Sequence, residues 1–143
     1  MEHVLVGIDG QHDAWEAFAR ACLLAKRIDA KLHVLLVLTP SGEGLPHGDP
    51  EREATVRQRL ELLVEAAKSD GIQINYFITE GHYEDEIIRF VNHYRITLLV
   101  YQPPDGDIKS AEKGSGSLPA IRHRISCKVE LVAPKTKKQE RIV

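Results

Sequence analysis

Five short apolar segments recur along the chain and have the composition of β-strands. His3–Asp9 and Lys31–Leu38 are nearly continuous runs of apolar and β-branched residues, which is typical of parallel strands covered on both faces. In Ile72–Thr79, by contrast, apolar and polar residues alternate, which predicts a strand at or near a sheet edge. Ile96–Tyr101 and Lys128–Val132 complete the set. The sequence therefore predicts five strands, with Lys31–Leu38 in a central position.

Between these segments the apolar residues return with the period of a helix. The first helix is predicted to begin at a capping box formed by Asp13 and Glu16. The second begins at Asp49-Pro50, a good cap followed by a residue that the first turn tolerates, and Gly71 is placed to end it. The first predicted helix extends to Asp29 and the second to the stop at Gly71; the others cover Tyr83–Tyr94 and about Ser117–Arg124.

Strands and helices alternate along the chain, and the connections are long enough for right-handed crossovers between parallel strands. This order predicts an α/β protein, a three-layer sandwich with a five-stranded parallel sheet. We expect a single domain over residues 1–134, followed by a basic C-terminal tail over residues 135–143. In such folds ligands bind beyond the carboxyl ends of the strands. The segments that follow strands there are Asp9–Asp13, Leu38–Gly48, Glu80–His82 and Gln102–Ser117.

The composition is that of one soluble globular domain. The 143 residues are 43% apolar and 28% charged, with a formal net charge of −2. A chain of this length forms a core without disulfides or metal ions. Its longest apolar run, near Leu32–Leu38, is far shorter than the ~20 residues of a membrane-spanning helix. Asp9 interrupts the first apolar stretch, so no secretory segment is predicted and we expect a cytoplasmic protein without membrane association.

Positive charge is concentrated at the C-terminal end of the chain. Residues 117–143 contain seven basic and two acidic residues, whereas residues 1–116 contain 12 basic and 19 acidic ones. No aromatic residue or glycine is interleaved among the lysines of the tail to stack on bases. We therefore expect a solvated tail and no specific binding of nucleic acid.

A glycine-rich segment precedes the last predicted helix. Gly106 and Gly116-Ser117 are separated by nine residues, and Ser117 opens the helix. The unpaired backbone N–H groups and the positive dipole end at a helix start suit a phosphate group. Glycine and serine are also ordinary N-cap residues, so the segment by itself leaves both interpretations open.

Taken together, these features resemble the universal stress protein family over nearly the whole chain. The resemblance rests on the order of elements, on VGIDG, KLHVLLV and ISCKVELV, and on the Gly-x9-Gly-Ser segment. It implies a Rossmann-like fold of the adenine nucleotide alpha hydrolase type, with the first strand beside the fourth and an adenine-nucleotide pocket between them. It also implies a homodimer formed through the last strand, Lys128–Val132.

The resemblance assigns candidate nucleotide contacts to particular positions. Asp9 matches the aspartate that holds the base or ribose, and Gly106 and Gly116-Ser117 match the end of a Gly-x2-Gly-x9-Gly-Ser/Thr phosphate loop. Tyr101 either stacks on adenine or fills the pocket. The candidate residues are Asp9, Gly10, Val37, Tyr101, Gly106, Gly116 and Ser117. The implied ligand is ATP or AMP, with Mg²⁺ only where a nucleotide is bound.

The phosphate pattern is incomplete. Its first glycine is replaced by the segment QPPD, and the match to Gly106 requires one inserted residue. Proline has no N–H to donate, while Asp105 and Asp107 add negative charge beside the phosphate position. Loss of two hydrogen bonds to a charged group, at about 1.5–3 kcal/mol each, lowers affinity by roughly 10² to 10⁴. Unless a nearby lysine compensates, adenine-nucleotide binding is predicted to be weak or lost.

Other site chemistries have less support in the sequence. There is no Walker A loop or G-x-G-x-x-G motif. His82 with the acids after it, and His47 with Asp49, fall short of the three or four donors of a metal site. Cys22 and Cys127 have no CxxC spacing and are interpreted as ordinary buried thiols.

We therefore expect a dimeric binding or signalling module of the stress response rather than an enzyme. In one version, a nucleotide bridges Asp9 and the Gly106–Ser117 segment and orders the Thr39–Pro50 loop. In the other, no nucleotide is held and the scaffold serves dimerisation or partner docking. The alternative is a nucleotide hydrolase or transferase with Mg²⁺ held by Asp9 and Asp105, although the sequence offers no general base for it.

Overall fold

A computed structural model gives the fold of the protein and describes residues 2–12, 14–40, 49–103 and 118–133. Five parallel strands form one sheet in the order β3-β2-β1-β4-β5. They are β1 (His3–Asp9), β2 (Lys31–Leu38), β3 (Ile74–Glu80), β4 (Leu98–Tyr101) and β5 (Lys128–Leu131). The predicted parallel sheet is confirmed, as are the pairing of the first strand with the fourth and the edge position of β3.

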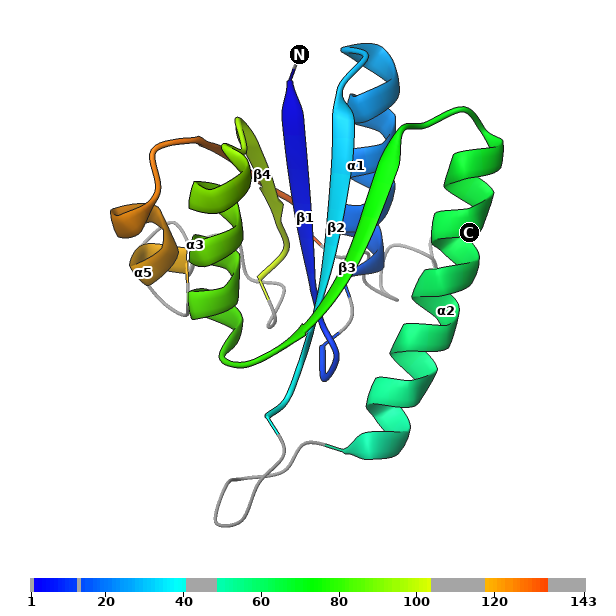
Figure 1. Cartoon of the computed structure of the whole chain (residues 1–143), viewed down its shortest axis with the longest axis vertical. Coiled ribbons are helices and arrows are strands. Elements are labelled where there is room, and N and C mark those ends of the chain that lie inside the picture. The colour runs from blue at the N-terminus through cyan, green and yellow to red at the C-terminus, as the bar shows by residue number, and fades with distance from the viewer. Residues whose placement is uncertain (1, 13, 41–48, 104–117, 134–143) are drawn as a thin grey trace, which may run out of the picture.

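Helices cover both faces of this sheet and complete the predicted three-layer sandwich (Figure 1). α1 (Trp15–Arg27) and α2 (Pro50–Ser69) pack on one face, and α3 (Tyr83–Tyr94) and α5 (Leu118–Arg124) pack on the other. β1 contributes Val4 and Val6 to the first core and Leu5 to the second. Its continuous apolar sequence thus reflects burial on both faces. None of the described helices combines the length and the apolar character needed to cross a membrane.

The ends of α2 follow the sequence signals. Asp49 is the N-cap, and its side chain accepts hydrogen bonds from the N–H groups of Glu51 and Arg52. Pro50 occupies the first helical position. Gly71, two residues beyond Ser69, has φ +90°, a left-handed conformation that side chains disfavour. The predicted cap and stop are therefore confirmed.

The start of α1 differs from the predicted capping box. Ala14 is at the N-cap and no side chain at that position caps the helix, while Asp13 lies outside the described residues. Gln102, from the end of β4, supplies the missing partner: its Oε1 accepts from the N–H of Ala17 at 3.0 Å. Its Nε2 donates to Glu16 at 3.2 Å, so this glutamate contacts Gln102. A residue distant in sequence therefore performs the role assigned to a local motif.

Two strands begin later than predicted, and for one reason. The N–H groups of Ile72 and Ile96 donate to the carbonyls of Ala67 and Val91, at 3.2 and 3.1 Å. Both isoleucines thus close the preceding helix before the strand starts, although their buried side chains gave them the appearance of strand residues. At the other end of the chain, β5 stops one residue before the predicted Val132, and residues 135–143 lie outside the described residues.

Candidate functional site

A cavity of about 430 Å³ lies at the carboxyl ends of β1 and β2, beside the turn that follows β3. Parallel strands place their carboxyl ends at one edge of the sheet, which is where ligands bind in this class of fold. Three of the four segments selected from the sequence supply its wall. The described lining residues are Asp9, Gln11, His12, Val37, Leu38, Thr39, Pro40, Gly81, His82 and Tyr83.

Asp9 and Val37, both predicted site residues, are direct neighbours at the base of this cavity. They face each other in the β1–β2 register, and the N–H of Gly10 donates to the Val37 carbonyl at 3.0 Å. The Asp9 carboxylate accepts from the N–H of Gln11 at 2.9 Å and lies 3.6 Å from Nδ1 of His12. Its side chain is 30% exposed. The carboxylate is therefore oriented by the turn and still accessible to a ligand.

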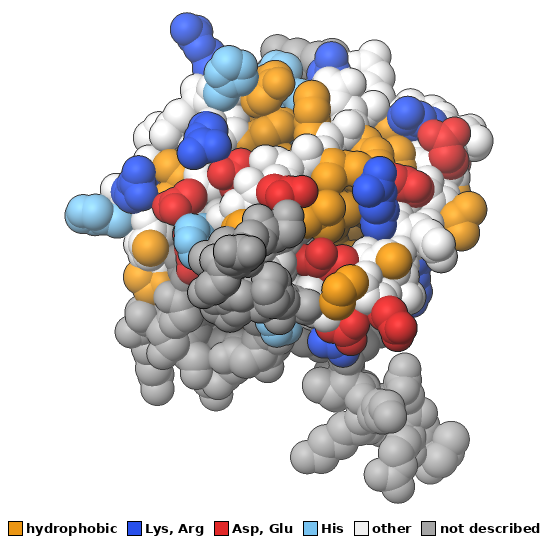
Figure 2. Space-filling model, turned by 60° about the horizontal axis from the view of Figure 1, so that its bottom comes forward, with side chains coloured by type: hydrophobic (Ala, Val, Ile, Leu, Met, Phe, Trp, Pro, Cys, Tyr) orange, Lys and Arg blue, Asp and Glu red, His pale blue; other side chains and the backbone are white. Residues whose placement is uncertain are grey.

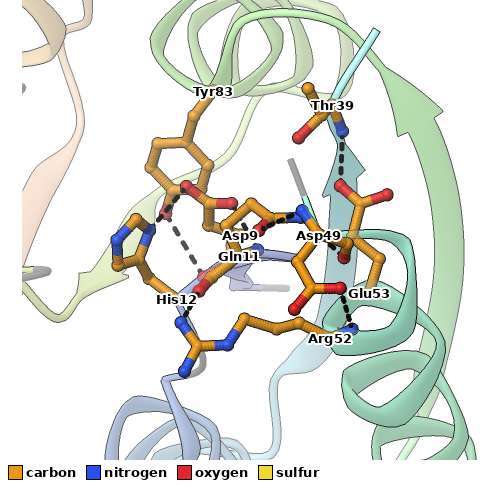
Figure 3. Close-up of polar contacts among 9 residues, drawn as sticks. Asp9, Gln11, His12, Thr39, Asp49, Arg52, Glu53 and Tyr83 are labelled. Carbon is orange, nitrogen blue, oxygen red and sulfur yellow. Dashed lines mark hydrogen bonds and ion pairs between the residues drawn. The ribbon is translucent and has the colours of Figure 1, made fainter. Parts of the chain in front are cut away.

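The turn after β1 is fastened to the start of α2 by Gln11 (Figure 3). Its side chain accepts from the N–H of Asp49 at 3.0 Å and donates to the carbonyl of the same residue at 3.3 Å. Arg52 donates to the Gln11 carbonyl at 3.0 Å. The N–H of Thr39 donates to Glu53 at 2.8 Å, which ties the end of β2 to the same helix. Two sides of the cavity are therefore held in place by contacts within the protein.

Two carboxylates, Asp9 and Glu53, and the guanidinium of Arg52 are grouped around this end of the cavity. Burial acts to raise the pKa of Glu53, but hydrogen bonds from Thr39 and Gln11 outweigh it and hold the pKa below its ordinary value. Glu53 therefore stays ionised and contacts Thr39, a lining residue of the cavity. Hydroxyl and amine donors are favoured beside these carboxylate acceptors. The carboxylates thus suit a ligand that carries hydroxyl or amino groups.

Tyr83 is the lining residue that the sequence analysis missed. It is the first residue of α3, and its phenol donates to the carbonyl of Gly7 in the middle of β1 at 3.2 Å. Burial, together with the proximity of Tyr101 and Asp9, holds the pKa of Tyr83 well above its ordinary value, so the phenol remains a donor. The available signal was its position directly after Glu80–His82, a segment already selected because it follows a strand.

Tyr101, the aromatic residue that was selected, lies in the core. It is 2% exposed, and its ring centroid is 6.4 Å from that of Tyr83. The described lining of the cavity includes Tyr83 and not Tyr101. Direct stacking of Tyr101 on adenine stays a prediction; the observed contact is with the residue that does line the cavity.

The remaining predicted contacts belong to a different part of the chain. Gly106, Gly116 and Ser117, the proposed phosphate-binding residues, lie outside the described residues, as does His47. Asp9, Gly10 and Val37 are thus the sequence-selected residues that the structure brings together at the cavity.

The described residues offer neither a metal site nor a reactive thiol. In the described parts of the chain, no group of three or more His, Cys, Asp or Glu residues is arranged to hold a metal ion. Cys22 and Cys127 are half-buried rather than fully buried. Burial, with a contribution from Asp70, raises the pKa of Cys22 to about 11, and burial also raises that of Cys127. Both thiols are therefore protonated at neutral pH and are poor nucleophiles.

The fold and the cavity together define a Rossmann-like α/β protein with a cavity at the carboxyl edge of its sheet. A model of the universal stress protein family matches residues 1–102, and the chain belongs to this family. The match ends at Gln102, where the segment that departs from the phosphate pattern begins. No curated protein matches the chain at the sequence level.

Several solved structures share the fold. A universal stress protein in complex with cAMP is 23% identical, with a TM-score of 0.67 over 94% of this chain and 98% of that one. One from Archaeoglobus fulgidus in complex with dAMP is 15% identical, with a TM-score of 0.61 over 92% and 97%. One from Arabidopsis thaliana with AMP bound is 18% identical, with a TM-score of 0.55 over 96% and 95%. At these identities the likeness establishes a common architecture.

Proposed function

We propose that the protein is a cytoplasmic binding module of the stress response, whose cavity takes the adenosine part of an adenine nucleotide such as AMP or ATP. The observation that carries this proposal is the accessible Asp9 carboxylate, held in register with Val37 at the base of a 430 Å³ cavity. That volume falls within the range of about 300–1,000 Å³ that small-molecule sites occupy.

The chemistry of the cavity supports a nucleoside. Asp9 offers acceptor positions to ribose hydroxyl groups or to the amino group of adenine. Val37, Leu38 and the ring of Tyr83 supply apolar surface for a flat base. The complexes of related proteins with cAMP, dAMP and AMP agree with this ligand class, because all three contain an adenine base.

The phosphates contribute less in this proposal. The prolines at positions 103 and 104 cannot donate backbone hydrogen bonds to a phosphate. We propose therefore that AMP and ATP bind with similar, weak affinity, and that Mg²⁺ enters only with a nucleotide. The protein acts through occupancy of the cavity rather than through turnover.

A homodimer is the second part of the proposal. β5 forms the edge of the sheet opposite β3, and the described residues place no further strand beside it. An open strand edge is suited to pairing with another copy of the same strand. We propose that the dimer forms through Lys128–Val132, which supports a scaffold role whether or not the cavity is occupied.

Thermal unfolding with added AMP, ATP and GMP tests the ligand assignment, together with mass spectrometry of the purified protein. AMP at ten times its Kd is expected to stabilise the fold by about 1.4 kcal/mol, a rise in Tm of roughly 4–6 °C. ATP should give a similar rise and GMP a smaller one. Asp9→Asn is expected to weaken AMP binding about tenfold because it removes a charged acceptor.

The matched control is Asp29→Asn, an exposed aspartate before β2 in a left-handed conformation that asparagine tolerates. It should leave the response to AMP unchanged. No rise in Tm at millimolar AMP or ATP rejects the nucleotide part of the proposal and leaves the scaffold. Conversion of ATP to ADP above the protein-free rate, abolished by Asp9→Asn, would establish the hydrolase instead.

A further inference from the structure

The outer side of β3 presents unpaired backbone groups. At the two ends of the strand, the N–H of Leu32 donates to the Gln73 carbonyl and the N–H of Gly81 donates to the Leu38 carbonyl. Because peptide groups alternate in direction along a strand, the odd-numbered residues of β3 bond to β2. The groups directed away from the sheet belong to Tyr76, Ile78 and Glu80. In the described chain, no strand covers this side.

This edge lacks the features that usually prevent strand addition. Edge strands are commonly protected by lysine, proline, a bulge or shortness. β3 has seven residues, INYFITE, with neither lysine nor proline, and it pairs with β2 in regular register along its whole length. β5, the opposite edge, has four residues and begins with Lys128. Of the two edges, β3 is therefore the longer and the less protected.

A groove runs beside this edge, between β3 and α3. Its volume is about 330 Å³, and it is lined mainly by apolar side chains, among them Phe77 of β3 and Phe90 and Tyr94 of α3. The rings pack on one another, with centroids 5.2 Å apart for Phe77 and Phe90 and 4.3 Å apart for Phe90 and Tyr94. Figure 2 shows hydrophobic side chains gathered in a strip on this face between flanking charged ones.

The charges along the edge indicate what a partner should carry. Glu86, at the end of the groove, is already satisfied by Thr79 at 2.8 Å and Arg89 at 3.0 Å. Glu80, at the end of the strand, is exposed and has no ion-pair partner among the described residues. Ile78, 38% exposed, precedes it on the same side of the strand. A partner strand gains most by placing an apolar residue beside Ile78 and a basic residue beside Glu80.

We propose that β3 and the groove beside it form a docking site for an extended peptide segment of a partner protein. The segment adds to the sheet as a sixth strand and bonds to the outward peptide groups of Tyr76, Ile78 and Glu80. Alternate side chains of an added strand point to opposite faces. One apolar side chain therefore enters the groove over Phe77, while on the opposite face an apolar and a basic residue lie beside Ile78 and Glu80.

Selection from a display library of random peptides of about ten residues tests this proposal on the full chain. Enriched peptides are expected to alternate apolar residues and to carry a lysine or arginine near one end. A synthetic copy of an enriched peptide is then compared with a second copy. In the second copy, the backbone N–H groups that would bond to β3 are N-methylated. N-methylation keeps the side chains but removes the main-chain donors, so it should abolish binding measured by fluorescence anisotropy.

Two proline variants locate the site. Ile78→Pro removes an N–H that points away from the sheet, so β2–β3 pairing is retained. It should weaken peptide binding about tenfold or more. Val129→Pro is the matched control at the opposite edge. The N–H of Lys128 donates to the Thr97 carbonyl, so even-numbered residues of β5 bond to β4. The N–H of Val129 therefore also points away from the sheet. Val129 lies in the strand proposed to form the dimer, so this variant should weaken self-association and leave peptide binding unchanged. The Tm of each variant is measured to confirm folding.

The proposal is overturned if no peptide is enriched, if N-methylated and unmodified peptides bind alike, or if Val129→Pro and not Ile78→Pro removes binding. The proposal is also overturned if Ile78→Pro abolishes self-association of the protein, because the edge would then be occupied by a second copy of the chain. Loss of peptide binding in Ile78→Pro with an unchanged response to AMP supports it.

Discussion

Gly7→Ala is expected to destabilise the protein by about 3 kcal/mol, because the added methyl group has no room in the core. A Cβ at this position would lie 2.4 Å from Cδ1 of Ile87 and 2.8 Å from the phenol oxygen of Tyr83. Relief of these contacts requires the buried side chain of Ile87 and the phenol of Tyr83 to shift, or α3 to move away from β1. Overpacking of a core costs about 1–3 kcal/mol, and loss of the Tyr83 hydrogen bond to the Gly7 carbonyl adds about 1 kcal/mol.

Urea unfolding measures this change, and a second substitution identifies its cause. Ile87→Val removes the atom closest to the added methyl group, at its own cost of about 0.5–1.5 kcal/mol. The double variant Gly7→Ala/Ile87→Val should therefore be more stable than the sum of the two single changes predicts. Strict additivity would show that the close approach of α3 to β1 is not what requires glycine. Because Tyr83 lines the cavity, Gly7→Ala should also weaken binding of AMP.

Acidification from pH 6.5 to pH 4 is expected to remove about 3 kcal/mol of stability through His33. This histidine of β2 is 3% exposed. Its Nε2 lies 3.1 Å from Nδ1 of His3, its own Nδ1 has no hydrogen-bond partner, and Phe90 and Tyr94 of α3 pack against its ring. Burial, together with the charges of His3 and Lys31, lowers the pKa of His33 from 6.5 to about 4.

The sign follows from which state binds the proton first. The unfolded chain protonates His33 near pH 6.5, whereas the folded protein resists protonation until about pH 4. Stability from this residue is therefore complete above pH 6.5 and falls progressively between these values. Below pH 4 both states are protonated and the loss no longer grows. The difference between the two pKa values corresponds to about 3 kcal/mol in the free energy of unfolding.

Urea unfolding of wild type and His33→Leu between pH 4 and pH 7 tests this expectation. The variant should lose most of the pH dependence over this interval, because leucine fills the site without a titrating group. His93→Leu, an exposed histidine of α3, is the control and should retain the wild-type slope. Equal slopes in wild type and His33→Leu would assign the acid sensitivity to other groups.

Local patterns in the sequence predict the elements well where the signal itself is local. The bounds of β1 and β2, the cap at Asp49 and the stop at Gly71 agree with the structure because each depends on neighbouring residues. The start of α1 does not, because Gln102 reaches its first turn from β4. The starts of β3 and β4 were placed too early because a buried isoleucine that closes a helix has the same pattern as one that opens a strand.

In the candidate site, too, local signals are predicted from the sequence and contacts between distant residues are not. Asp9 and Val37 are found from sequence because they stand at the carboxyl ends of two predicted strands, and parallel pairing brings them together. Tyr83 and the contacts of Gln11 with Asp49 depend on side chains that meet across long sequence separations. The period of apolar residues carries no information on such contacts. They can be identified only when the packing of the helices and strands is known.

An NMR titration of the isotope-labelled protein with AMP tests most directly that the cavity at the carboxyl ends of β1 and β2 is the ligand site. The predicted result is a set of saturable amide shifts at Asp9, Val37 and Tyr83, weakened about tenfold by Asp9→Asn. His3 and His33, at the amino ends of the same strands, should not shift. Shifts confined to that opposite end, or no shifts at millimolar AMP, would contradict the assignment of this cavity.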